Sequence, residues 1–269
     1  MKVAGAPFFG TPTSAGRVQR VVSLVPSWTE TIAQVGASSA LVGVTKWCTR
    51  PQALVSGIEK VGGTKDPNVT RIVAIAPDLV VCEKEENRRE DVEAMRAAGL
   101  DVWVSDVRSV RDSVHWTREL GSAVGHAHAG AALATRIEEA ARHVSSHVSR
   151  HMSVYVPIWR HPWMTLTRDT YAHSVLSIAG ADNVFADAQG RYPERSPEDA
   201  IKAGAVAALL PTEPYPFHEK PAALDELVAA GFSPDTVRIV DGEALTWYGA
   251  RAVNGMGAVG ATIQAISGR

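Results

Sequence analysis

Residues 127–150 read AHAGAALATRIEEAARHVSSHVSR. The stretch contains no proline, and Gly130 is its only glycine, so it lacks the residues that usually interrupt a helix. It predicts one long helix of roughly 20 residues or more, about 30 Å at 1.5 Å per residue. A flexible linker would be rich in Gly, Ser and Pro, whereas this segment is rich in Ala. We therefore expect a stiff helix that joins two halves of the chain.

On both sides of this helix, short apolar runs alternate with longer amphipathic segments. The pattern is typical of a mostly parallel sheet with crossover helices. Strands are predicted at 21–25, 41–45, 78–82, 102–104, 154–156, 206–210 and 237–240. The predicted fold class is therefore α/β, with two Rossmann-like lobes at 19–126 and 151–269 that contain parallel-dominated sheets. One long backbone α-helix at 127–150 joins them.

Helix starts are marked by capping residues and by proline. The predicted starts are Ser27 with Glu30, Asp66-Pro67, Asn87, Ser109 with Asp112, and Ser196-Pro197. Further helices are expected at 170–179, 220–230 and 250–267.

Composition narrows the classes of function. The chain has 269 residues, of which 45% are hydrophobic and 21% charged, and its formal net charge is −2. These values are ordinary for a globular protein and argue against a nucleic-acid partner. No apolar run approaches the roughly 18 residues that a membrane span needs.

The N-terminus gives no export signal, because Gly5, Pro7, Gly10 and Pro12 interrupt any apolar run. We expect a cytoplasmic protein, or a periplasmic or extracellular one if an export signal has been removed. Two cysteines, Cys48 and Cys82, are too few for a disulfide scaffold. Buried thiols are favoured over a disulfide, a metal site or a nucleophile, and the redox state is left open.

Unusual polar and aromatic residues follow five of the predicted strands. In open parallel sheets, ligands bind beyond the carboxyl ends of the strands. The candidate ligand-binding residues are Trp47, Glu83, Glu86, Asn87, Arg88, Trp159, Arg160, Trp163, Arg168, Tyr192, Glu213, Tyr215, Phe217, Glu243, Trp247 and Tyr248. Aromatic faces with a few charges suit a flat or amphipathic organic ligand. Arg160 and Arg168 could clamp a carboxylate or phosphate.

Several of these motifs also have purely structural interpretations. Glu86 and Asn87 could belong to a helix cap. Arg168-Asp169 could be an ion pair between the lobes, and Tyr192 could pack in a turn. Trp28, which also follows a strand, is interpreted as packing within its lobe.

Histidines offer a weaker signal. His143, His147 and His151 recur at i, i+4 and i+8 on the long helix, a spacing that can bind a metal. A solvated helix face explains them better, and His161 and His173 are minor candidates. We assign no metal ligand and no catalytic residue.

Four stretches resemble a known family: RVVSLVPSWTE at 20–30, LVGVT at 41–45 with Trp47 after it, VGGTKDPN at 61–68, and IAPDLVV at 75–81. They are similar to the helical-backbone metal-receptor superfamily of class III periplasmic solute-binding proteins, and most similar to its cobalamin-binding-like subgroup. The resemblance covers about residues 19–268.

This resemblance implies a ligand cleft between the lobes and a small organic or metal-chelate ligand, such as a corrinoid or other tetrapyrrole. Trp47 and Trp163 would pack on its faces, and Arg160 and Glu213 would meet its amide side chains. Glu83 and Glu86 could instead orient a charged metallocofactor. An ABC permease is an implied partner, but the chain offers no assignable pair of acidic docking residues and no export signal.

Two alternatives remain at this point. An intracellular or metal-dependent enzyme would use cleft arginines and the carboxylates of Glu83, Glu86, Glu213, Asp241 and Glu243. A ligand-free interaction scaffold would have its cleft filled by aromatic side chains. We expect non-catalytic binding.

Overall fold

The computed structural model describes residues 18–267. The prediction about an export signal concerns residues 1–17 and lies outside the described residues. The described chain forms two compact units. The N-terminal unit comprises residues 18–107 and 114–135, and the C-terminal unit comprises 108–113 and 136–267.

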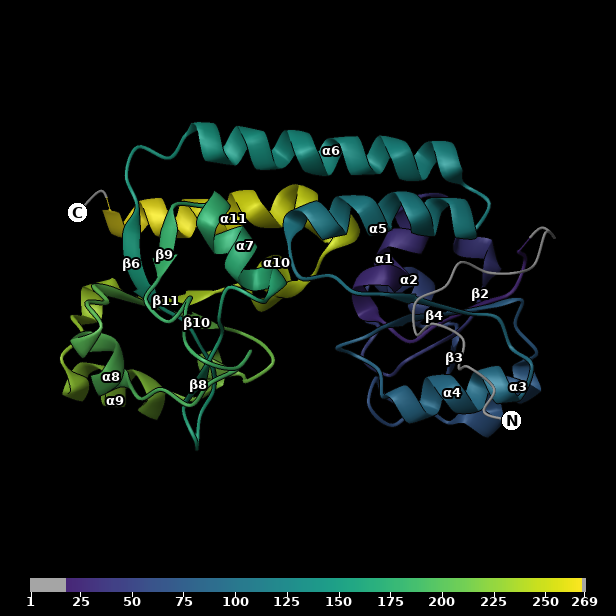
Figure 1. The fold of residues 1–269 in the computed structure, drawn as a ribbon, viewed down its shortest axis with the longest axis horizontal. Helices are drawn as coiled ribbons and strands as arrows, with labels where there is room; N and C mark the ends of the chain where they lie inside the picture. Colours follow the sequence, from purple (N-terminus) through teal and green to yellow (C-terminus); the bar gives the residue numbers. More distant parts are fainter. Residues whose placement is uncertain (1–17, 268–269) are drawn as a thin grey trace, which may run out of the picture. The chain divides into compact units, whose positions relative to one another are not determined.

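A five-stranded parallel sheet forms the centre of the N-terminal unit, in the order β3-β2-β1-β4-β5. Figure 1 labels β2, β3 and β4 of this sheet. Its strands are β1 (Val21–Ser23), β2 (Leu41–Val44), β3 (Glu59–Lys60), β4 (Leu79–Glu83) and β5 (Val102–Ser105). Its helices are α1 (Pro26–Gln34), α2 (Gln52–Val55), α3 (Val69–Ile75), α4 (Arg89–Ala97) and most of α5 (Val110–Ala123), with a short 3-10 turn, η1 (Ser38–Ala40). The chain runs outward in opposite directions from β1 and β4, so the loops after these two strands meet at the topological switch point.

The C-terminal unit repeats this design with the strand order β11-β10-β6-β9, again all parallel. Its strands are β6 (Met152–Tyr155), β9 (Ala181–Asn183), β10 (Ala207–Pro211) and β11 (Val237–Val240), with an antiparallel hairpin of β7 (Pro157–Trp159) and β8 (Met164–Thr165). Its helices are α7 (Tyr171–Ile178), α8 (Pro197–Lys202), α9 (Ala222–Ala230), α10 (Gly242–Thr246) and α11 (Ala252–Ser267), with 3-10 turns η2 (Phe217–Glu219), η3 (Pro234–Thr236) and η4 (Gly249–Arg251). Here the switch point lies between β6 and β10.

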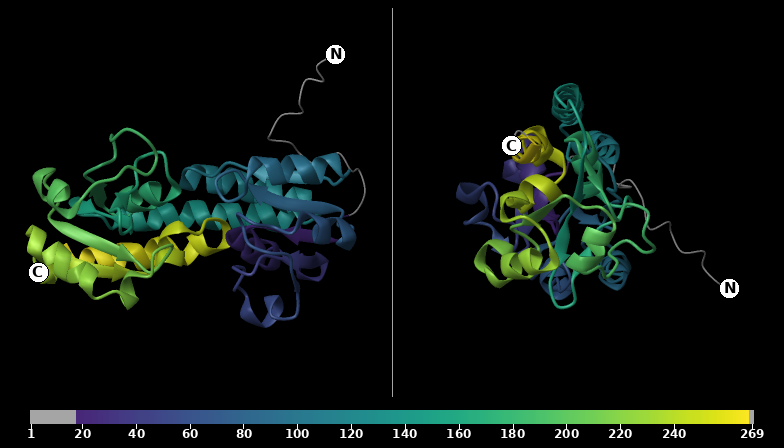
Figure 2. Two further views of the ribbon diagram at one scale, coloured as in Figure 1. Left: turned by 90° about the horizontal axis from the view of Figure 1, so that it is seen from below. Right: turned by 90° about the vertical axis from the view of Figure 1, so that its left-hand side faces the viewer.

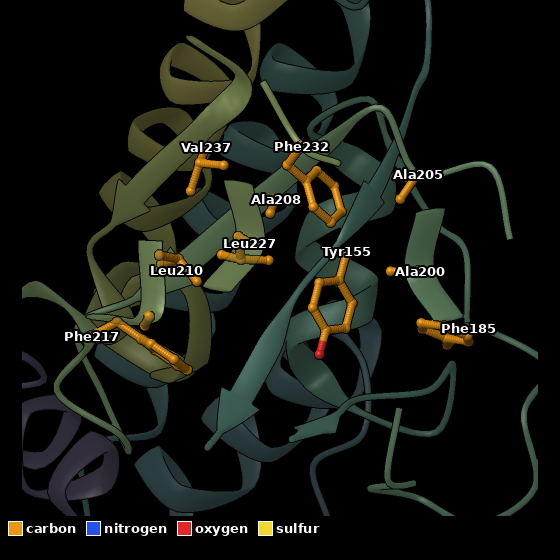
Figure 3. Close-up of a cluster of buried hydrophobic side chains, with 11 residues drawn as sticks. Tyr155, Phe185, Ala200, Ala205, Ala208, Leu210, Phe217, Leu227, Phe232 and Val237 are labelled. Carbon is orange, nitrogen blue, oxygen red and sulfur yellow. The ribbon is translucent and has the colours of Figure 1, made fainter. Parts of the chain in front are cut away.

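One core of the C-terminal unit is aromatic. Tyr155 of β6 stacks on Phe232 with ring centroids 6.3 Å apart, and its hydroxyl donates to the Arg195 carbonyl at 2.7 Å. Figure 3 shows Phe217 at one end of this cluster, next to Leu210. The yellow helix α11 packs on α7 and on β11 (Figures 1 and 2).

The long helix is confirmed. It is α6 (Ala127–Ser146), with 20 residues, and it ends four residues before the predicted boundary. Within the N-terminal unit, a Cβ on Gly121 of α5 would lie only 2.6 Å from the Cα of Gly130 of α6. The two glycines therefore let the two helices approach closely.

The predicted strands are confirmed within one or two residues, but three of the five predicted helix starts are wrong. Ser27 makes no cap, because α1 already begins at Pro26. Asn68, and not Asp66, caps α3 by accepting from the Arg71 amide. Asn87 lies before the Arg88 N-cap of α4 and has a different role, described below. The starts at Ser109 and Ser196 are confirmed, the latter as a full capping box with Asp199.

A candidate ligand-binding site

The loop after β6 forms the β7–β8 hairpin, which the sequence did not predict. Pro157 pairs with Thr165 and Trp159 with Met164. The Thr165 hydroxyl donates to the Val156 carbonyl at 2.7 Å, which ties the second strand to the end of β6. The turn of this hairpin carries Arg160 and Trp163, so three predicted site residues come from one short element.

These residues meet the loop after β10. Trp159 packs edge-on against Tyr215 at 5.4 Å between centroids, and Tyr215 lies 4.7 Å from Phe217. Trp163 stacks nearly parallel on Phe217, at 5.8 Å and 11°. We call Trp159, Trp163, Tyr215 and Phe217 the aromatic cluster. Phe217 is 2% exposed and Trp159 is 44% exposed, so the cluster leads from the core to the surface.

A carboxylate that the sequence analysis missed holds this cluster in place. Glu226 of α9 forms a two-point ion pair with Arg160, in which Nε lies 3.2 Å from Oε2 and Nη2 contacts Oε1. The Trp163 indole N–H donates to the same Oε2 at 3.1 Å. Glu226 raises the pKa of Arg160, and Arg160 in turn lowers the pKa of Glu226. The Tyr215 side chain also contributes to the raised pKa of Arg160.

A second group follows β10 and β11. The Glu213 carboxylate accepts from the Trp247 indole at 2.7 Å and from the Thr246 hydroxyl at 3.0 Å, while burial raises the pKa of Glu213. Arg251 lies 5.7 Å over the Trp247 ring and pairs with Glu243 at 3.2 Å. The structure therefore brings Glu213, Glu243 and Trp247 together, but Glu213 is bonded to Trp247 and Glu243 is paired with Arg251.

The close approach of α10 to the loop after β10 depends on Gly242. A Cβ at that position would lie 2.6 Å from the Glu213 amide nitrogen, so the start of α10 needs a glycine to approach the β10 loop.

Three further predicted residues have other neighbours. Buried Tyr248 packs edge-on against Tyr171 at 5.7 Å. Arg168 pairs with Asp187 on the surface, and Arg191 lies 5.9 Å over the Tyr192 ring. Asp169 pairs with Arg108 at 2.9 Å, so Arg168 and Asp169 have separate partners and do not pair with each other.

In the N-terminal unit, Glu83 and Asn87 close the loop after β4. The Glu83 carboxylate accepts from the amides of Glu85 (2.6 Å), Glu86 (3.0 Å) and Val107 (3.2 Å). The Asn87 side chain accepts from the Glu83 amide at 2.9 Å and donates to the carbonyls of Leu24 at 3.3 Å and Thr64 at 3.0 Å. Both residues are buried. Asn87 thus joins the loops at the switch point, which is why it does not cap α4.

Glu83 has an unusual ionisation. Burial raises its pKa to about 7, the nearby Glu86 carboxylate adds to the rise, and the backbone donors oppose it. A buried carboxylate loses its hydration, which disfavours the charged form.

The other predicted residues of this unit are more exposed. Trp47 is 58% exposed, with the Lys46 ammonium 5.3 Å from its ring centroid. Arg88 pairs with Asp91 through two hydrogen bonds of 2.8 and 3.1 Å. Of the seven tryptophans, all within the described residues, only Trp47 and Trp159 are exposed.

The cysteines and the histidines of the sequence analysis have other neighbours. Cys48 and Cys82 are free and buried, and Cys48 lies 3.1 Å from the hydroxyls of both Thr29 and Thr45. Among residues 18–267, no group of three or more His, Cys, Asp or Glu side chains could hold a metal ion. His143 and His147 pack with centroids 4.5 Å apart, while His151 contacts Asp182 at 2.9 Å. In the same part of the chain, no helix combines the length and apolarity needed to cross a bilayer.

Comparison with solved structures shows the same fold in two periplasmic proteins. The vitamin B12 binding protein of Vibrio cholerae matches with a TM-score of 0.79 and 19% identity, over 94% of this chain and 99% of that chain. The heme-binding protein of Roseiflexus sp. RS-1 matches with a TM-score of 0.80 and 22% identity, over 93% and 99%.

Sequence comparison points the same way. The vitamin B12-binding protein of Salmonella paratyphi A is 29% identical over 206 residues, which cover 73% of this chain and 76% of the relative. That of Pectobacterium carotovorum is 24% identical over 200 residues, covering 73% and 72%. Residues 21–220 match the family described as periplasmic binding protein. The resemblance found in the sequence is therefore confirmed, and the chain belongs to the periplasmic binding protein family.

Proposed function

We propose that this solute-binding protein binds a planar macrocycle, a corrinoid or another tetrapyrrole, and that the aromatic cluster contacts it. The observation that carries the proposal is the position of half-exposed Trp159, packed edge-on against Tyr215, where the loops after β6 and β10 meet. Ligands of open parallel sheets bind at such switch points. Relatives of the chain include proteins named for vitamin B12, and proteins of the same fold are named for vitamin B12 and for heme.

The packing of the cluster supports this role. Phe217 is buried in the core and fixes Tyr215 and Trp163, while Arg160 and Glu226 fix the hairpin. A surface ordered before binding loses little conformational entropy when a ligand arrives. Aromatic faces also contribute apolar area without a requirement for matched hydrogen bonds, which suits a large ring system.

Other parts of the sequence-based hypothesis stay predictions. These are the position of the ligand between the two halves, the contribution of Trp47, the cytoplasmic location and docking to an ABC permease. The enzyme and scaffold alternatives also stay predictions.

Titration tests the proposal. We expect purified protein to bind cyanocobalamin or hemin saturably, measured by calorimetry and by quenching of tryptophan fluorescence. Trp159→Ala should weaken binding about tenfold, or about 1.4 kcal/mol, because it removes the exposed aromatic face. Val206→Ala, which truncates another exposed apolar side chain, is the control and should leave binding unchanged. Wild-type protein that binds neither probe, or full affinity in Trp159→Ala, would contradict the proposal.

A further inference from the structure

We propose that Glu226 sets the selectivity of the site. By neutralising Arg160, it makes the aromatic cluster favour a macrocycle with uncharged amide side chains over one with carboxylate side chains. This inference rests on the proposed function and adds a residue to it that the sequence analysis did not single out.

The first step is the geometry of the ion pair. A guanidinium offers a planar fork of donors that matches a carboxylate at two points. Glu226 already occupies this fork, through Nε at 3.2 Å and through Nη2. The Arg160 side chain is only 13% exposed, whereas that of Glu226 is 39% exposed. The partner that solvent and ligand meet more readily is thus the negative one.

The second step is the consequence for a ligand. A carboxylate approaching Arg160 would have to displace Glu226 or lie beside its negative charge, and both cost free energy. An amide side chain carries no charge and meets no such repulsion. Aromatic rings tolerate either ligand, so the discrimination comes from the ion pair and not from Trp159.

The third step separates charge from positioning. Glu226 also accepts the Trp163 indole N–H at 3.1 Å, so Glu226→Ala would disturb the hairpin as well as the charge. Glu226→Gln keeps one acceptor oxygen, which can still accept the Trp163 indole N–H, and it removes the charge together with the second acceptor oxygen that faces Arg160. His161 also lies close enough to affect Glu226, so all variants are compared at one pH.

Matched ligand pairs provide the test. For a corrin ring, the pair is dicyanocobinamide and dicyanocobyrinic acid, which differ mainly in amide against carboxylate side chains. For a porphyrin ring, the pair is hemin dimethyl ester and hemin. Dissociation constants for both members are measured with wild type, Glu226→Gln, Arg160→Gln and the double variant, whose folding is checked by circular dichroism and thermal unfolding.

We expect wild type to prefer the uncharged member of the pair. Glu226→Gln should shift the ratio of dissociation constants about tenfold toward the carboxylate member, because it frees the Arg160 charge. The double variant should lose this shift, and Arg160→Gln alone should strengthen the preference for the uncharged member. An unchanged ratio in folded Glu226→Gln would overturn the inference while leaving the proposed function standing. Wild-type protein that binds neither ring system would overturn both.

Discussion

Both units are built on a parallel sheet, but different kinds of side chain lie at the two switch points. In the N-terminal unit, Glu83 and Asn87 are buried and bond to backbone groups of their own loop and of neighbouring loops. In the C-terminal unit, the corresponding loops carry aromatic rings that extend from buried Phe217 to half-exposed Trp159. Buried polar side chains satisfy the backbone of an irregular loop. Exposed aromatic rings have no such structural purpose, and we therefore assign binding to the C-terminal cluster first.

The largest expected effect tests the structural half of this comparison. Asn87→Ala removes three hydrogen bonds, two of which join separate loops, and should lower the free energy of unfolding by about 2–4 kcal/mol. Denaturant unfolding measures the change. Asn254→Ala, at an exposed position of α11, is the control and should change stability by less than about 0.5 kcal/mol. Equal stability of the two variants would contradict a structural role for Asn87.

A smaller effect follows from the raised pKa of Glu83. Between its ordinary value of 4.5 and its folded value of about 7, the folded protein keeps a proton that the unfolded chain has lost. The stabilisation from Glu83 is therefore full below about pH 4.5 and is lost as the pH rises through about 7. The slope is at most about 1.4 kcal/mol per pH unit for one proton.

Unfolding of wild type and Glu83→Gln at several pH values between 5 and 8 measures this effect. The difference in unfolding free energy between the two proteins should shift against wild type as the pH rises. A difference that stays constant over this range would show that Glu83 does not titrate there.

The smallest effect concerns Trp47, the exposed tryptophan of the N-terminal unit. Within residues 18–267, the contact recorded for its ring is with the Lys46 ammonium. No aromatic ring in that range packs against Trp47 in the way that Tyr215 packs against Trp159. We expect Trp47→Ala to weaken ligand binding less than Trp159→Ala does, by about threefold or less, in the same calorimetric titration. A greater loss for Trp47→Ala would assign the main contact surface to the N-terminal unit.

The sequence was sufficient for the parallel sheets, the long helix and the family because apolar periodicity and strand-end motifs are local signals. It was insufficient where a residue's role depends on distant partners. Asn87 looks like a helix cap in sequence, but its partners Leu24 and Thr64 are 63 and 23 residues away. Glu226 lies on an ordinary amphipathic helix, 66 residues from Arg160, and no local pattern marks it. The β7–β8 hairpin was missed because its strands are only three and two residues long.

The most direct test of the central claim is one calorimetric titration of cyanocobalamin and of hemin into wild type, Trp159→Ala and Asn87→Ala, each under conditions in which the protein is folded. We predict that Trp159→Ala loses about tenfold in affinity for the macrocycle that wild type binds. Folded Asn87→Ala should bind it as wild type does, in spite of its lower stability. Full affinity in Trp159→Ala, together with a large loss of affinity in folded Asn87→Ala, would contradict the claim. That result would indicate that the loops of the N-terminal unit form the binding surface.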